Sequence, residues 1–277
     1  MLDEIILNAL KEDIGEGDHS SLACLKVEDK GSAKLLVKED GILAGVHVAQ
    51  RVFHLHDASL EIDVFIEDGA AIKVGDIVME VRGKAQSILS TERLVLNIMQ
   101  RMSGIATKTH HIVTQINHTG AKVLDTRKTT PGIRILEKMA VVIGGGMNHR
   151  FGLYDMIMLK DNHIDFSGGV KKVIQKTTSY VSSLSKPIHI EIEIRSKDEL
   201  LEAIDTDGVQ RILLDNFTPE ELKDLVPLIP AHIESEASGG ITEETIVAYA
   251  ETGVDFISMG ALTHSVKSLD LSLKAYF

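Results

Sequence analysis

The hydrophobic and polar positions of the chain first follow a helical pattern and then a strand pattern. Residues 2–10 place Leu, Ile and Ala at helical spacing, with two acidic residues in the first turn, where the helix dipole favours negative charge. From there to about residue 89, apolar or alternating runs such as 34–38 and 61–66 are separated by glycines. This part of the chain is therefore predicted to contain one helix followed by short strands.

A second pattern begins with a helical stretch over 91–116, which we expect to be interrupted around Gly104. After residue 120, strand-like and helical runs alternate, so the division into domains is expected at 1–106 and 107–277, with a C-terminal tail that can return to the first domain. The expected strands are 123–124, 156–159, 188–192, 212–214, 232–234 and 256–258. The expected helices are 133–143, 170–180, 198–204, 220–228 and 243–251.

Strands that alternate with helices indicate βαβ units and a parallel sheet. About six such strands in series favour an α/β barrel, and an open doubly wound sheet is the alternative. The open sheet usually has a glycine-rich turn after its first strand, and the sequence has none at that place.

Polar or small residues follow each expected strand. In an α/β barrel the carboxyl ends of the strands build the active site, so catalytic groups collect there. The alternative is that these residues cap the helices that follow. The six residues are Asp125, Lys160, Glu193, Asp215, Glu236 and Gly260.

Composition and charge limit the classes of ligand. The chain of 277 residues has a net charge of −12, which argues against general binding to nucleic acid or to an anionic membrane. A single Cys excludes a disulfide framework and fits a reducing compartment. With neither a signal peptide nor an apolar run long enough to span a bilayer, we expect a soluble, cytoplasmic protein.

Positive charge is nevertheless concentrated between residues 122 and 163, where basic residues outnumber acidic ones. Arg127 and Lys128 follow one strand, Arg150 and Lys160 flank the next, and His149 lies within the same cluster. Arg offers a planar fork to carboxylate or phosphate and Lys a mobile charge, so the segment is a candidate anion site. A solvated surface is the alternative interpretation.

Two glycine loops follow the last strands, at 238–240 and 260–263, and predict a phosphate site, although ordinary tight turns would look the same. Glu193 and Asp215 are carboxylates at separate strand ends. They could hold Mg²⁺ directly or through water, bind ribose hydroxyls, or only form ion pairs with the basic residues.

Several of these segments together resemble the quinolinate phosphoribosyltransferase family. The resemblance covers nearly the whole chain, and 144–150 with 160–163 carry most of it; Ala237 departs from the Ser that the family usually has in this loop. The matching segments are 91–97, 103–107, 125–134, 144–155, 160–163, 213–216, 238–240 and 260–265.

The resemblance implies an N-terminal α/β sandwich-like domain and an incomplete, open α/β barrel. It also implies a homodimer or a hexamer. The implied enzyme converts quinolinate and phosphoribosyl pyrophosphate into nicotinate mononucleotide, pyrophosphate and CO₂ with Mg²⁺, in de novo NAD biosynthesis.

The resemblance further implies roles for particular residues. Quinolinate would contact Arg127, His149, Arg150 and Lys160, with Arg93 supplied by the partner subunit, and Thr126 would be a further substrate-binding residue. Phosphoribosyl pyrophosphate would contact Lys128, Lys160, Glu193, Asp215, Ser238, Gly239, Gly260 and His264. Lys128, Lys160, Glu193 and Asp215 would be the catalytic residues, and Glu193 and Asp215 would also hold the metal.

Three other interpretations stay open at this point. Lys160 could form a Schiff base, as in class I aldolases, if it were uncharged. A molybdenum-associated paralogue of the family shares the Asp-Thr-Arg-Lys-Thr segment that begins at Asp125. A phospho-metabolite binding protein without turnover would need the same anion site.

Overall fold

The computed structural model describes residues 1–276, and the contacts within the chain divide it into two compact units. The first unit consists of Met1–His110, Thr129–Gly145 and the chain from Leu262 onward. The second unit consists of His111–Lys128 and Gly146–Ala261. Within residues 1–276, no helix is both long enough and apolar enough to cross a bilayer.

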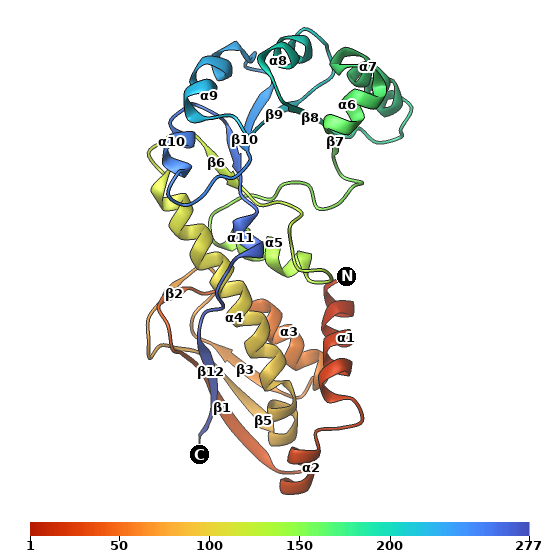
Figure 1. Ribbon diagram of the computed structural model, residues 1–277. Helices are drawn as coiled ribbons and strands as arrows, with labels where there is room; N and C mark the ends of the chain where they lie inside the picture. Colours follow the sequence, from red (N-terminus) through yellow and green to blue (C-terminus); the bar gives the residue numbers. More distant parts are fainter. Residues whose placement is uncertain (277) are drawn as a thin grey trace. The chain divides into compact units, whose positions relative to one another are not determined.

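The first unit contains an antiparallel four-stranded sheet in the order β12-β1-β5-β3 (Figure 1). Alternate residues of β1, namely Ala33, Leu35 and Val37, are buried, as expected for a strand that packs one face on a core. The C-terminal strand pairs with β1 along its whole length. The strands of this unit are β1 (Lys30–Val37), β2 (Gly41–Ile42), β3 (Glu61–Val64), β4 (Ala71–Ile72), β5 (Ile77–Lys84) and β12 (Leu271–Tyr276).

Two helices, α2 (His19–Cys24) and α3, correct the prediction that only strands lie between the first helix and residue 89. Helix α3 (Val46–His56) buries Val46, Ala49 and Phe53 at helical spacing. Gly45 precedes it with φ 101°, a conformation that favours glycine. The other helices with residues in this unit are α1 (Leu2–Ile14), α2 (His19–Cys24), α4 (Ala85–Gln115), α5 (Arg134–Ile143) and α11 (Ala261–His264).

The expected interruption around Gly104 is wrong, because α4 is one continuous helix. A side chain at this position would collide with the backbone of Lys267 and Ser268. Glycine is required here for the close approach of two segments of the first unit and not for a break in the helix.

The second unit is a parallel six-stranded sheet in the order β6-β11-β10-β9-β8-β7. Among the described residues β6 and β7 do not pair, so the barrel is incomplete and open, as predicted. The strands are β6 (Lys122–Leu124), β7 (Ile157–Leu159), β8 (Ile190–Ile194), β9 (Arg211–Asp215), β10 (Glu234–Ser238) and β11 (Phe256–Ser258). The helices are α6 (Asp161–Ser167), α7 (Val170–Ser182), α8 (Lys197–Ile204), α9 (Pro219–Leu225), η1 (Val226–Leu228) and α10 (Ile246–Ala250).

Two strands of this sheet lie later in the chain than predicted. The expected strands 188–192 and 232–234 are observed as β8 and β10, which end at Ile194 and Ser238. Glu193 and Glu236 are therefore inside strands and not in the loops that follow them. Because side chains alternate along a strand, their orientation is set by the sheet itself.

Candidate active site

A pocket of about 390 Å³ lies at the carboxyl ends of the strands of the second unit. Most of the predicted site residues line it, and the sheet therefore brings together residues that are far apart in the sequence. The lining residues are Thr126, Arg127, Lys128, His149, Arg150, Met158, Lys160, Glu193, Leu213, Asp215, Glu236, Ser238 and Ser258.

Four predicted residues are not among those that line the pocket. Gly239 and Gly260 belong to the second unit. Gly239 directly follows Ser238 of β10, and Gly260 is two residues after Ser258 of β11; both serines line the pocket. Arg93 and His264 belong to the first unit, and both are exposed. Arg93 is on α4, and His264 is at the end of α11, where its Nδ1 lies 2.7 Å from Ser265 Oγ.

Arg150 and Arg127 are brought close enough to repel each other. Burial, together with the positive charge of Arg127, lowers the pKa of Arg150 below its usual value. Two hydrogen bonds hold the Arg150 guanidinium in place. Its Nη1 donates to Met156 O at 3.2 Å and its Nη2 to Met158 Sδ at 3.6 Å. An anion placed between the two arginines would relieve their repulsion, so this end of the pocket is suited to a carboxylate or a phosphate.

The ammonium of Lys160 donates to Glu193 Oε2 at 2.7 Å. Lys160 also precedes α6, and its backbone N–H donates to His163 Nδ1 at 2.9 Å. His163 therefore supports the loop that begins at Lys160.

Glu193 and Asp215 project from neighbouring strands into the same pocket. Asp215 is the last residue of β9, and its Oδ2 accepts a hydrogen bond from Asn216 Nδ2 at 2.5 Å. Carboxylate oxygens are the protein ligands that Mg²⁺ prefers, and this ion commonly takes only one or two of them together with water and phosphate oxygens. The donor set therefore fits Mg²⁺.

The loop that follows β9 lies in close contact with the loop that follows β10. Asn216 has φ 62°, the only positive φ at a residue other than glycine within residues 1–276, and its N–H donates to Ser238 O at 2.9 Å. Gly239 has φ 97°, and a side chain there would collide with Asn216. Glycine is thus required by the approach of the two loops as well as by the backbone conformation.

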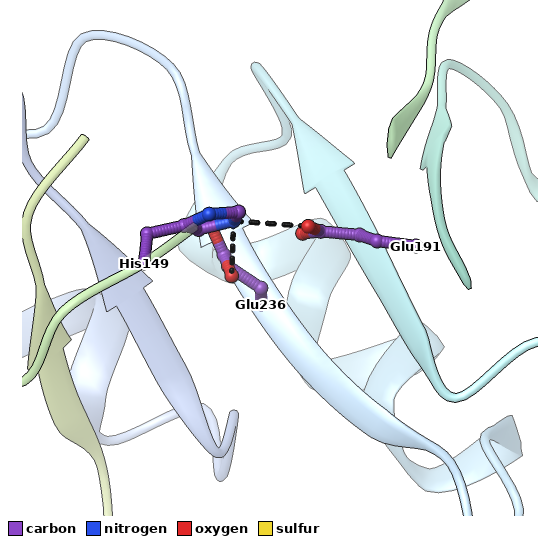
Figure 2. Close-up of side chains that lie close together, drawn as sticks. All are labelled: His149, Glu191 and Glu236. Carbon is purple, nitrogen blue, oxygen red and sulfur yellow. Dashed lines mark ion pairs between the residues drawn. The ribbon is translucent and has the colours of Figure 1, made fainter. Parts of the chain in front are cut away.

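His149 is held in the pocket wall by its backbone and by its ring. Its N–H donates to the buried Asp125 Oδ1 at 2.8 Å, and its Nδ1 accepts the N–H of Arg150 at 2.6 Å. Figure 2 shows two carboxylates near the same ring nitrogen, with Nε2 at 2.9 Å from Glu191 Oε2 and at 3.6 Å from Glu236 Oε2.

Sequence reasoning missed Glu191 altogether and treated Glu236 only as a residue after a strand. Glu191 and Glu193 are two positions apart in β8, and Glu234, Glu236 and Ser238 alternate in β10. Alternation places such residues on one face of the sheet. This signal could have found both carboxylates if the limits of the strands had been predicted correctly.

Burial raises the pKa of Glu191 and of Glu236, because a dry environment disfavours the charged form and, at Glu236, the charge of Glu191 adds to the effect. Arg211 opposes this shift at both carboxyls. Its Nη1 lies 3.1 Å from Glu236 Oε2, and its guanidinium lies over the Phe256 ring at 4.1 Å.

One histidine and two carboxylates, residue types that bind metal ions, lie close to one another and suggest a metal site. They are His149, Glu191 and Glu236. The hydrogen bond from Arg150 argues against this interpretation. An Nδ1 that accepts a hydrogen bond leaves the ring proton of a neutral imidazole on Nε2, which faces the carboxylates. A protonated nitrogen has no lone pair to give to a metal.

The fold and the pocket define an α/β barrel-type protein with a pocket lined by basic and acidic side chains at the carboxyl ends of its strands. In comparisons with known proteins, the family described as "Quinolinate phosphoribosyl transferase, C-terminal domain" matches residues 105–274. The family described as "Quinolinate phosphoribosyl transferase, N-terminal domain" matches residues 18–103.

Individual relatives agree with the family matches. The chain is 43% identical to a "Probable nicotinate-nucleotide pyrophosphorylase [carboxylating]" of Bacillus subtilis, over 98% of this chain and 92% of the relative. It is 42% identical to "Quinolinate phosphoribosyltransferase [decarboxylating] 2b, mitochondrial" of Nicotiana tabacum, over 99% of this chain and 82% of the relative. The crystal structure of NadC from Streptococcus pyogenes superimposes with a TM-score of 0.93 at 40% identity, covering 100% of this chain and 98% of that one. The chain belongs to the quinolinate phosphoribosyltransferase family.

Proposed function

We propose that this chain transfers the phosphoribosyl group of phosphoribosyl pyrophosphate to the ring nitrogen of quinolinate. The products are nicotinate mononucleotide, pyrophosphate and CO₂, and the reaction belongs to NAD biosynthesis. The observation that carries the proposal is the pocket in which Arg127, Arg150 and Lys160 line the same cavity as Glu193 and Asp215. The names of the relatives support the same reaction.

The cations of the pocket suit the charge of the two substrates. Quinolinate carries two adjacent carboxylates and phosphoribosyl pyrophosphate carries several phosphate charges, so they repel each other in solution. Arg127 and Arg150 are placed to bind a carboxylate, with Thr126 and His149 in the same wall. By offsetting this repulsion the basic residues allow both substrates to be held in reacting position.

The carboxylates suit the transfer step. When the quinolinate nitrogen attacks the anomeric carbon and the bond to pyrophosphate breaks, positive charge develops on the ribose. Glu193 and Asp215 can stabilise this charge and can accept hydrogen bonds from the ribose hydroxyls. Lys128 and Lys160 are assigned to the pyrophosphate, and Ser238, Gly239, Gly260 and His264 to the 5-phosphate.

We assign the Mg²⁺ ion to Glu193 and Asp215, directly or through water, because these carboxylates are the donors that fit it. When bound, the ion would neutralise charge on the departing pyrophosphate. The side chains of the pocket bind and orient the organic substrates.

The loss of CO₂ needs no strong base from the protein. After the transfer the ring nitrogen bears a positive charge. The electron pair of the bond to the neighbouring carboxylate can then move into the ring as CO₂ leaves, and a proton from solvent takes the vacated position. The pocket has only to keep the second carboxylate bound, which is the role given to Arg127 and Arg150.

A shared site completes the proposal. We assign Arg93 to the quinolinate pocket of a partner subunit in a homodimer, with a hexamer as the larger alternative, and we propose a cytoplasmic location because the chain has a single Cys. Mixing inactive Arg93→Ala and Lys160→Ala chains should restore part of the activity, since one site of each mixed dimer is intact. No recovery after demonstrated subunit exchange would contradict the shared site.

The reaction itself is tested with quinolinate and nicotinate in parallel, each with phosphoribosyl pyrophosphate and Mg²⁺. We expect nicotinate mononucleotide to form from quinolinate but not from nicotinate, because the carboxylate at the ring 2-position is needed for binding. Equal turnover of both would contradict the assignment. Borohydride trapping of a sugar phosphate on Lys160 would instead support an aldolase.

A further inference from the structure

The backbone of Lys160 is held by the first turn of α6. His163, the third residue of this helix, accepts the Lys160 N–H on its Nδ1 at 2.9 Å. A backbone N–H can only donate, so the contact identifies Nδ1 as the acceptor. The Lys160 carbonyl oxygen accepts the N–H of Ile164 at 3.0 Å. Both polar groups of the Lys160 backbone are therefore bound to the helix that follows it.

Lysine is an unusual residue at this position of a helix. Lys160 directly precedes α6, where Ser, Thr, Asp and Asn are preferred because their side-chain oxygen accepts an N–H group of the first turn. An ammonium has no lone pair with which to do so. The helix is capped in another way, because His163 reaches back to the Lys160 N–H as the third residue of a capping box does. A local rule that is broken beside a pocket and compensated three residues later indicates that Lys160 is placed there for its charge.

The other end of Lys160 is held by Glu193. The ammonium donates to Glu193 Oε2 at 2.7 Å and is about half exposed. A polyanionic substrate would draw the ammonium away from Glu193, and the backbone is then the end of the residue that stays fixed. Because the side chain is a flexible four-carbon stem, the position of the backbone limits where its charge can be placed.

His163 is not placed to contact the substrates itself. It is not among the described residues that line the pocket with Lys160 and Glu193. Its ring instead lines a separate groove of about 590 Å³, together with Phe166 and Tyr180. An effect of His163 on the reaction would therefore have to act through Lys160.

We propose that His163 is a positioning residue, which fixes the backbone of Lys160 so that the ammonium reaches the reacting substrates when it leaves Glu193. A displacement of about 1 Å in an active site can slow a reaction by about a hundredfold, so a contact outside the pocket can control the rate. The effect on the rate rests on the proposed function, whereas the contact between His163 and Lys160 stands on the geometry alone.

The contact is tested by hydrogen exchange of the Lys160 amide, followed by nuclear magnetic resonance on the whole protein without substrates. We expect slow exchange in the parent and in His163→Asn, whose Oδ1 can accept in place of Nδ1. His163→Leu has no acceptor, and its Lys160 amide should exchange at least about fivefold faster, as expected for the loss of a helix cap. Equal exchange in the parent and in His163→Leu would overturn the proposal.

Steady-state kinetics then separates positioning from substrate binding. We expect His163→Leu to lower kcat at least about tenfold, because the charge of Lys160 is no longer held in the reacting position. The KM for quinolinate should stay within about threefold of the parent, since Arg127 and Arg150 still bind its carboxylates. His163→Asn should recover most of kcat. An unchanged kcat in His163→Leu, or no recovery in His163→Asn, would contradict the positioning role.

Asp165→Asn is the matched control for the stability of the helix. Asp165 is also an exposed residue of α6, but its carboxylate pairs with Arg195 at 2.8 Å. This variant should keep the kcat of the parent even where it lowers the melting temperature as much as His163→Leu does. An equal loss of kcat in both variants would reduce His163 to a structural role and overturn the proposal. If the exchange results hold but the parent does not turn over quinolinate, the proposed function fails and the contact between His163 and Lys160 stands.

Discussion

Lys160 Nζ and Glu193 Oε2 lie 2.7 Å apart, so a cation and an anion of the proposed catalytic set neutralise each other across neighbouring strands. Lys160 is about half exposed whereas Glu193 is largely covered, and the ammonium can therefore turn toward a ligand while the carboxylate stays in place. Polyanionic substrates would compete with Glu193 for the ammonium. This pair is therefore the contact most directly affected by substrate binding.

Replacing the cation of this pair should disable the reaction. We expect Lys160→Met to lower kcat/KM for quinolinate by at least about a hundredfold, as is typical when a charge that stabilises the transition state is removed. Lys176→Met is the control, because Lys176 is an exposed lysine of α7 in the same unit and does not line the pocket. Steady-state kinetics checks both variants, and a loss below threefold for Lys160→Met would contradict its role.

A second prediction concerns the buried Glu137 of α5, which holds parts of the first unit together. Arg101 donates to Glu137 Oε1 at 2.7 Å and also to the carbonyl oxygens of Thr263 and Val266, while Thr130 donates its N–H to Glu137 Oε2 at 3.0 Å. Either single change, Arg101→Met or Glu137→Leu, leaves polar partners unpaired and should cost about 3–5 kcal/mol of stability.

The double variant should lose less than the sum of the two single variants, because neither charge is then left without the other. Thermal unfolding followed by circular dichroism measures the three variants under one condition. If the two losses simply add, the residues are not coupled and the interpretation is wrong.

The stability of the protein should also depend on pH through Glu236. Burial and the charge of Glu191 raise its pKa above the ordinary value of 4.5, so the folded protein holds a proton that the unfolded chain has already released. The contribution of this group is fully present below pH 4.5 and is lost as the pH rises through the raised value.

Glu236→Gln cannot lose this proton. Its melting temperature relative to the parent should therefore increase from about pH 5 to about pH 8, by the equivalent of about 1.4 kcal/mol for each unit of pKa shift. Glu234→Gln, at a carboxyl outside the cluster with His149, should show no such trend. If the melting temperatures of Glu236→Gln and the parent differ by the same amount at both pH values, the raised pKa of Glu236 is contradicted.

Two glycines should respond differently to the same substitution. In the interior of a helix Gly→Ala normally adds about 1 kcal/mol of stability, but at Gly104 the new methyl group would collide with the backbone of Lys267. We expect Gly104→Ala to lower the melting temperature and Gly120→Ala, which meets no atom within 4 Å, to leave it nearly unchanged. A stabilised Gly104→Ala variant would show that the two segments separate easily.

The sequence predicted the alternating strands and helices of the second unit because most of its strands contain a short apolar run, although β10, Glu-Ser-Glu-Ala-Ser, does not. It failed at α3, whose helical spacing of Val46, Ala49 and Phe53 was overlooked among glycine-rich strands, and at Gly104. A glycine needed for close packing looks the same in sequence as a glycine that breaks a helix. Only the contact with Lys267 distinguishes them.

The sequence predicted only the part of the site that a local pattern reveals. The basic residues that line the pocket were found because they gather in one segment of the chain. Glu191 was missed because its role depends on where β8 ends and on which residues face it from β10 and from the loop that carries His149. Such pairings are long-range, and a local pattern does not contain them.

The central claim is tested most directly by measuring CO₂ and pyrophosphate released from quinolinate labelled in its 2-carboxylate. The account predicts equal amounts of both products, formed together with nicotinate mononucleotide and only when phosphoribosyl pyrophosphate is present. Pyrophosphate release without labelled CO₂, or CO₂ release without phosphoribosyl pyrophosphate, would contradict it.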